Sequence, residues 1–144
     1  MSMEEAAALD MSSILLHAYD LGDMINTSAE LADYLYWKQA VDNDAEAQEL
    51  IKLFAKAKER FEECERFGHF HPNYHEGLQH VQEVQNLMDN NKAVLRFKTA
   101  EDRLDELLYS ISETIAHSVS DTIKVPGNKM LTAKGCSGGC KSCG

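Results

Sequence analysis

The chain has 144 residues, a formal net charge of −10 and only two prolines, and it is rich in residues that favour helices. This length suits one domain that can bury a core without disulfides or structural metals, and the composition predicts an all-α fold. The acidic charge disfavours direct binding to nucleic-acid phosphates, and the sequence contains neither a membrane-length apolar stretch nor a secretory signal, so we expect a cytoplasmic protein.

The charge divides the chain into two parts. Residues 1–123 contain all 24 acidic residues and 10 of the 14 lysines and arginines, which gives a formal charge of −14. Residues 124–144 contain four lysines and no acidic residue, which gives +4. We therefore predict a helical domain over 1–123 and a flexible tail, rich in glycine and cysteine, over 124–144.

Two helices are predicted in the first third of the chain. The first, of about four turns, follows from apolar residues at helical spacing: Ile14, Leu15, Ala18, Leu21 and Ile25. Thr27 and Glu30 have the spacing of a capping box and predict the start of the second helix, which continues to Val41.

Asp44 is expected to cap a third helix, which carries a seven-residue repeat of apolar positions. These positions are Leu50, Phe54, Ala57, Phe61 and Cys64. The helix should end near Gly68 and Pro72, because glycine favours a helix C-terminus and proline cannot continue the helix. The repeat predicts that this helix packs against a partner helix.

A shorter helix is predicted after Asn73, and a last, long helix of about 30 residues carries apolar positions from Val94 to Val119. We expect the long helix to end at Val125 and Pro126 and to pair with the helix over 44–67 as a long antiparallel hairpin, with a further chain covering what remains exposed. The predicted architecture is thus a small helical bundle built on this hairpin.

The tail sequence "KGCSGGCKSCG" places Cys136, Cys140 and Cys143 in a C-x3-C-x2-C motif. Gly138 and Gly139 permit the sharp turns that bring several thiolates around one metal centre. Three thiolates suit an iron–sulfur cluster or zinc, and the alternative is a reactive or disulfide-forming tail. The same spacing occurs in radical enzymes that cleave S-adenosylmethionine, but the α/β pattern of those enzymes is absent here.

The remaining candidates favour structural roles. Cys64 could complete a cluster, but its position in the apolar repeat is typical of a small buried side chain. His69, His71, His75 and His80 lie among aromatic residues, which favours a packed interhelical loop over a metal site. No Ser-His-Asp set, phosphate-binding loop or pair of carboxylates is apparent, so we expect no enzymatic activity.

Two long stretches and the terminal cysteines resemble the YlbF/YmcA family of small helical proteins, and are nearest to its YlbF branch. The stretches are "IKLFAKAKERFEECERFGHFHPNYHE" (51–76) and "VLRFKTAEDRLDELLYSISETIAHSVSDTIKVPG" (94–127). The resemblance covers nearly the whole chain. It implies a non-catalytic helical protein with a long hairpin that often self-associates.

The resemblance also implies partners and a cofactor. The YlbF branch is associated with YmcA-like and YaaT-like proteins in an iron–sulfur complex. That complex promotes mRNA maturation by the endoribonuclease RNase Y and influences competence, sporulation and biofilm formation. The role of ligand to a 4Fe–4S cluster transfers by motif to Cys136, Cys140 and Cys143. Family tails carry an additional cysteine beyond these three, so we expect the cluster to be shared with a partner subunit.

Overall fold

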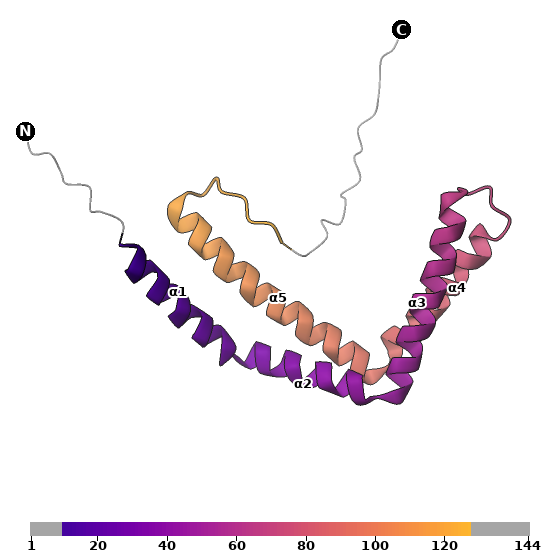
Figure 1. Cartoon of the computed structure of the whole chain (residues 1–144), viewed down its shortest axis with the longest axis horizontal. Helices are drawn as coiled ribbons and strands as arrows, with labels where there is room; N and C mark the ends of the chain where they lie inside the picture. Colours follow the sequence, from indigo (N-terminus) through magenta and orange to yellow (C-terminus); the bar gives the residue numbers. More distant parts are fainter. Residues whose placement is uncertain (1–9, 128–144) are drawn as a thin grey trace, which may run out of the picture. The chain divides into compact units, whose positions relative to one another are not determined.

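The structure is a computed structural model that describes residues 10–127. Regular secondary structure in this range is entirely helical, which confirms the all-α prediction. The helices are α1 (Met11–Asn26), α2 (Ala29–Asn43), α3 (Ala45–Arg66), α4 (Tyr74–Asn90) and α5 (Lys92–Val119) (Figure 1). They belong to two compact units, the first ending at Leu104 and the second beginning at Asp105, within α5. None of these helices combines the length and apolar character that crossing a bilayer requires.

Short polar side chains cap four of the helices, three of them through two hydrogen bonds each. Asp10 caps α1, Asp44 caps α3 as predicted, and Asn91 stands immediately before α5 and caps it. In each case one side-chain oxygen accepts hydrogen bonds of 3.0–3.3 Å from two backbone N–H groups of the first turn. Each cap of this kind stabilises its helix by about 1 kcal/mol.

The predicted cap of the second helix is wrong by one residue. Ser28, not Thr27, caps α2: its Oγ accepts a hydrogen bond from the backbone N–H of Leu31 at 3.2 Å. The hydroxyl of Thr27 instead donates to the carbonyl oxygens of Asp23 and Met24 at the end of α1. Both residues can cap a helix, but only Ser28 has the extended backbone of an N-cap, with φ −70° and ψ 151°, whereas Thr27 still forms the end of α1.

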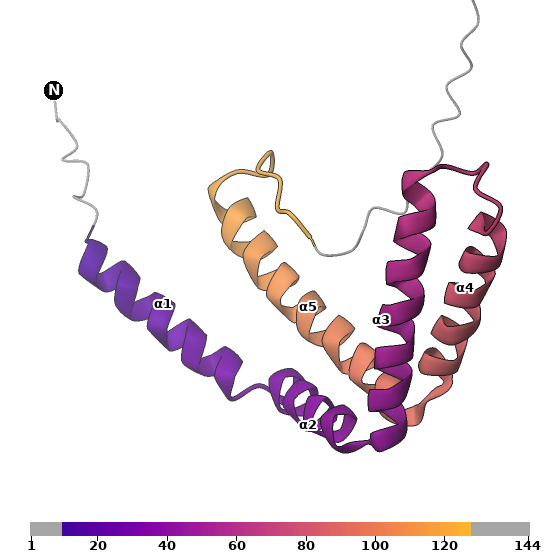
Figure 2. The same ribbon diagram turned by 45° about the vertical axis from the view of Figure 1, so that its right-hand side comes forward.

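Helices α3 and α4 lie side by side as an antiparallel hairpin (Figures 1 and 2). The chain reverses at Gly68, whose φ of +76° is the left-handed conformation that glycine adopts at a helix C-terminus, as the sequence predicted. Between the helices, Ala57 and Val84 are only 3% and 2% exposed. The ring of Phe61 packs on the ring of Tyr74, with centroids 5.2 Å apart. The seven-residue repeat of α3 therefore has its partner helix.

That partner is not the expected one. The sequence pattern assigned the helix over 44–67 to the long last helix, whereas in the first unit its most extensive contact is with α4. Helix α4 follows α3 after a short turn, and consecutive helices joined in this way normally pack together. Its own apolar positions then fill the α3 groove.

The end of the long helix was also misplaced. Helix α5 stops at Val119, six residues before Val125. Beyond it, the Ser120 side chain accepts from the backbone N–H of Thr122 at 3.3 Å, and the two hydroxyls lie 2.9 Å apart. Such local side-chain bonds offer the backbone an alternative to the helical ladder, so the helix ends before the proline is reached.

The core of the first unit lies at the base of the hairpin, where α2 meets α3 and α4 meets α5. Val41, Ala47 and Val94 are buried there against half-buried neighbours. These neighbours are Ile51, Met88, Ala93 and Phe97. The side-chain amide of Asn91 donates to Asp44 at 3.4 Å, so the caps of α5 and α3 are tied together. Lys98 forms an ion pair with Asp89 beside this junction.

Candidate functional site

The three cysteines predicted to bind a cluster lie outside the described residues. Cys136, Cys140 and Cys143 all follow Gly127, the last residue that the structure describes. The ligand assignment therefore stays a prediction. Within residues 10–127, no three histidine, cysteine, aspartate or glutamate side chains are grouped so that they could hold a metal ion.

The second unit determines where the tail begins. After α5 the chain turns back, and the segment over 120–127 runs alongside the helix (Figures 1 and 2). At its end Gly127 lies against the ring of Tyr109, so close that a Cβ at position 127 would stand 3.2 Å from two ring carbons. The predicted tail therefore starts beside the middle of α5 rather than beyond its end.

Tyr109 is held by a neighbour on the same helix. Its hydroxyl donates a hydrogen bond to Oε1 of Glu113 at 3.2 Å. The negative charge of Glu113 raises the pKa of Tyr109 above its ordinary value, and the hydrogen bond and slight burial act in the same direction. The phenol thus stays protonated, and able to donate this bond, to a higher pH than a free tyrosine does.

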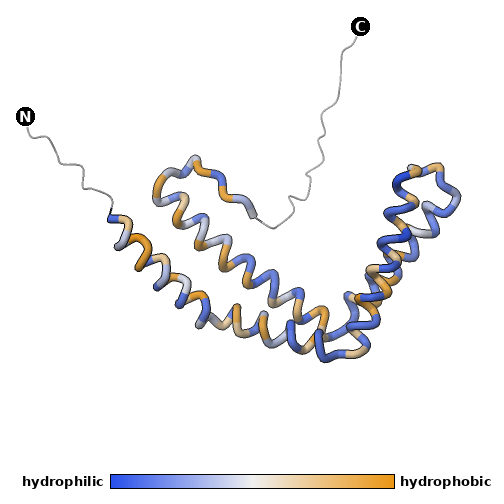
Figure 3. Tube along the Cα trace, viewed as in Figure 1, coloured by the Kyte–Doolittle hydropathy of each residue, from blue (hydrophilic) through white to orange (hydrophobic). Residues whose placement is uncertain are grey.

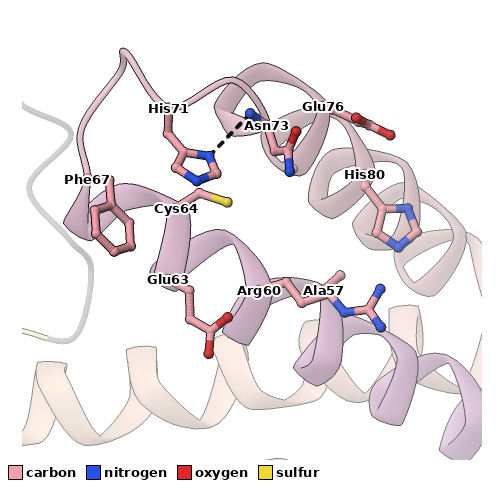
Figure 4. Close-up of a pocket in the computed structure, with 10 residues that line it drawn as sticks. Ala57, Arg60, Glu63, Cys64, Phe67, His71, Asn73, Glu76 and His80 are labelled. Atoms are coloured by element: carbon pink, nitrogen blue, oxygen red, sulfur yellow. Dashed lines mark hydrogen bonds between the residues drawn. The ribbon is translucent and has the colours of Figure 1, made fainter.

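A second candidate is a hollow of about 440 Å³ at the turn end of the α3–α4 hairpin (Figure 4). Its floor includes the small residues Ala57, Cys64 and Gly77, and Phe67 and His71 stand at the turn. Arg60, Glu63, Glu76 and His80 are charged or polar lining residues. Cys64 is half-buried and lines an open space, so it is not the fully buried side chain that the apolar repeat suggested.

His69, His71 and His75 contact aromatic rings, but the predicted packed loop is only partly formed, because Phe67 and Phe70 are 73% and 99% exposed. His69 meets Tyr74 edge-on with centroids 4.5 Å apart, and His71 lies 5.7 Å from Phe67. The Nδ1 atom of His71 also accepts a hydrogen bond from the backbone N–H of Asn73 at 3.2 Å, directly before α4. These contacts give the histidines a structural role in the turn.

The first helix presents a third candidate, an apolar surface without a buried residue. None of the 16 residues of α1 is buried, and the apolar positions along it are visible in Figure 3. Leu15 and Tyr19 are 53% and 73% exposed. Side chains of this size normally pack inside a protein or an interface, so α1 has the character of an interaction surface.

This surface contains a repeat that the sequence prediction missed. Met11, Leu15, Ala18, Gly22 and Ile25 are separated by four, three, four and three residues. We call these five residues the α1 seam. The prediction placed Leu15, Ala18 and Ile25 on one face but did not extend the repeat through the glycine. The seven-residue spacing that identified the apolar repeat of α3 would also have identified this one.

Comparison with known proteins agrees with this architecture. A family model described as "Control of competence regulator ComK, YlbF/YmcA" matches residues 14–120. The chain is 34% identical over 140 residues to the "Regulatory protein YlbF" of Bacillus subtilis (strain 168), which covers 96% of this chain and 94% of that protein.

A solved structure is similar as well. It is a chain from the X-ray crystal structure of Bacillus subtilis RicA in complex with RicF, with a TM-score of 0.73 and 32% sequence identity. The match covers 80% of this chain and all of that one. The family model and a relative that is 34% identical over nearly the whole chain agree, and the helical fold supports them: the chain belongs to the YlbF/YmcA family.

Proposed function

We propose that the chain is a non-enzymatic regulatory subunit of an iron–sulfur complex with YmcA-like and YaaT-like proteins. The complex promotes mRNA processing by RNase Y and thereby influences competence, sporulation and biofilm formation. Family membership supports a regulatory role, since the matching model concerns control of a competence regulator. The similarity to a chain solved as a complex of RicA with RicF supports assembly with another subunit.

The observation that carries the proposal is how little of the described chain is buried. Six apolar side chains are buried in residues 10–127, and three of them are alanines: Val41, Ala47, Ala57, Val84, Val94 and Ala100. Large apolar residues of α1, α2 and α5 are exposed instead. A chain of this size normally buries roughly two-thirds of its unfolded surface, so partner subunits have surface left to cover.

Charge favours an adaptor over a nuclease. Residues 1–123 carry a formal charge of −14, which repels the phosphates of RNA. Such a subunit acts on transcripts through a nuclease rather than by holding RNA itself. The lysines of the segment over 124–144 are too few to offset the charge of the body.

The donor set of the tail fits a thiolate-bound cluster. Cys136, Cys140 and Cys143 offer three soft ligands within eight residues, and Lys134 and Lys141 offset the negative charge of thiolates. A bound cluster supplies a redox-active centre at this position. The fourth ligand comes from a partner subunit in this proposal, which places the cluster at a subunit boundary.

Anaerobic co-purification of the chain with YmcA-like and YaaT-like proteins tests the proposal. We expect a brown complex that contains iron and acid-labile sulfide. Changing Cys136, Cys140 and Cys143 together to serine should remove both. The matched control is Cys64→Ser, a cysteine change in α3 that should leave iron and sulfide at the wild-type level.

The same experiment separates the alternatives. If the wild-type complex contains zinc and no sulfide, the tail binds zinc and not an iron–sulfur cluster. A metal-free complex whose count of free thiols falls reversibly under mild oxidant would indicate a thiol-redox tail. Unchanged iron and sulfide in the triple variant would show that the tail is not the ligand.

A further inference from the structure

We propose that the α1 seam is the docking surface for a helical partner subunit that carries lysine or arginine beside its own apolar residues. The inference rests on the proposed function, because it names the surface through which the regulatory subunit joins its complex. The occupant is a different protein chain, not a second copy of this one.

The spacing of the α1 seam predicts a helical occupant. Apolar residues repeated every seven positions form a line along one side of a helix, and that line packs into the grooves of another helix. In α3 the same repeat is covered by α4, whereas Met11 and Leu15 remain more than half exposed. An isolated helix of this length is only marginally stable in water, so docking also stabilises α1 itself.

Gly22, the fourth of the five residues of the α1 seam, adds a second indication. A glycine inside a helix destabilises it by about 1 kcal/mol relative to alanine. Nothing in the described chain explains that cost, because a Cβ built at Gly22 would meet no atom within 4 Å. The absent side chain does allow a partner helix to approach closely at this point.

The apolar surface is wider than a two-stranded coiled coil requires. Ile14 and Leu21 flank the seam on one side, and Tyr19 flanks it on the other. Helices with so broad an apolar face pack against two neighbours, as in helical bundles. The occupant is therefore a pair of helices packed side by side, in the way that α3 and α4 pack in this chain.

Charge identifies the kind of partner. The first 37 residues contain seven acidic residues and neither lysine nor arginine. Pairing two copies through α1 would bring two such segments together, and like charges at an interface oppose association. The same charge repels anionic lipid headgroups, to which amphipathic helices attach through lysine and arginine. A helical protein with basic residues around its apolar surface fits both properties of α1.

Two neighbouring leucines provide the test. Leu15 lies in the α1 seam, and Leu16 is outside the seam, about 100° further round the helix, and is 65% exposed. Binding of Leu15→Asp and Leu16→Asp to the YmcA-like protein from the same genome is measured by isothermal titration calorimetry. We expect Leu15→Asp to weaken binding at least about 100-fold, because it buries an unpaired charge. Leu16→Asp should stay within about threefold of wild type, as exposed substitutions do.

Further measurements secure the interpretation. Circular dichroism of the unbound chain shows whether either variant changes the helix content. Gly22→Leu is a second variant on the seam, which should also weaken binding because its side chain occupies the space meant for the partner. Raising the salt from about 50 to about 500 mM should weaken wild-type binding if basic residues face α1.

Three results would overturn the inference. Equal binding by Leu15→Asp and Leu16→Asp would exclude the α1 seam while leaving the proposed complex intact. A wild-type chain that dimerises alone and becomes monomeric in Leu15→Asp would make a second copy the occupant. Binding that does not change with salt would exclude a basic partner. If wild type binds neither the YmcA-like nor the YaaT-like protein, the proposed function itself fails.

Discussion

Gly127 lies against the ring of Tyr109, 18 residues earlier in the chain, and holds the segment over 120–127 against α5. A Cβ at Gly127 would stand 3.2 Å from two ring carbons, closer than the roughly 3.5–4.0 Å of an optimal carbon contact. Gly127→Val should therefore release this segment. We expect faster tryptic cleavage after Lys124 with unchanged helix content by circular dichroism. In a Tyr109→Ala background the same change should have no further effect on cleavage, and an additive effect would contradict the contact.

The titration of Tyr109 should depend on Glu113. Because the neighbouring carboxylate raises the pKa of Tyr109, the folded state holds this proton more tightly than the unfolded state. Its contribution to stability is present below the ordinary tyrosine pKa and is lost as the pH rises through the raised value. The difference in tyrosinate absorbance between wild type and Tyr109→Phe isolates this group. Glu113→Gln should lower its pKa, and an unchanged titration midpoint would refute the assigned cause.

A charge inside the α3–α4 hairpin should be costly. Phe61 is half-buried against Tyr74 and Gly77, so Phe61→Asp places an unpaired carboxylate between the helices. We expect a loss of about 3–5 kcal/mol in the free energy of unfolding, measured with urea. Phe70→Asp is the matched control, because Phe70 is 99% exposed, and it should change stability by less than about 0.5 kcal/mol. Similar losses in both variants would contradict the packing.

The hydrogen bonds that Asp44 accepts as a cap should stabilise α3 independently of its negative charge. Asp44→Ala removes the acceptor for two backbone N–H groups and the link to Asn91, and should cost about 1–2 kcal/mol of unfolding free energy. Asp44→Asn keeps a capping oxygen and should lose less than half of that. Thermal denaturation of both variants at the same protein concentration makes the comparison. Equal losses would show that charge, not hydrogen bonding, matters here.

Two glycines of the hairpin should respond to alanine in opposite directions. Gly68 has a positive φ, so Gly68→Ala should destabilise the chain by about 1 kcal/mol. Gly77 lies inside α4, and an alanine Cβ there would make an ordinary contact with the Phe61 ring at 3.4 Å. Gly77→Ala should therefore stabilise the chain by up to about 1 kcal/mol. Urea denaturation measures both, and changes of the same sign would contradict this account.

The sequence predicted the helices where local chemistry decides them. The cap at Asp44 follows from a side chain that acts within three residues of itself, and the reversal at Gly68 from the backbone freedom of glycine. Helix α4 begins after Asn73 as predicted, although the Asn73 side chain makes no capping hydrogen bond. The predicted cap at Thr27 is wrong because Ser28, the next residue, can also cap a helix and does so. The predicted end of α5 at Val125 and Pro126 is wrong because the Ser120 side chain, which the prediction did not use, accepts from the backbone N–H of Thr122 beyond Val119.

Tertiary pairing was less predictable. The stripe ending at Cys64 indicates that α3 needs a partner, but apolar repeats in α4 and α5 satisfy that need equally well in sequence. The structure decides for α4 because the Gly68 turn brings it alongside. The environment of Cys64 was unpredictable for a related reason: Cys64 lines a hollow whose other lining residues include Gly77 and His80 of α4, which only the pairing of the two helices brings there. The cluster ligands were named from spacing alone, and they remain a prediction.

The α3–α4 hairpin pairs residues that are close in sequence, whereas the buried cluster of Val41, Ala47 and Val94 joins segments from before and after the hairpin. Loop-closure entropy rises with the length of chain between two contacting residues, and local contacts form sooner. The order of folding follows: the hairpin forms first, and its closure brings the ends of α2 and α5 together at the base. The hairpin is thus complete within one stretch of chain, whereas α1 has no buried residue of its own.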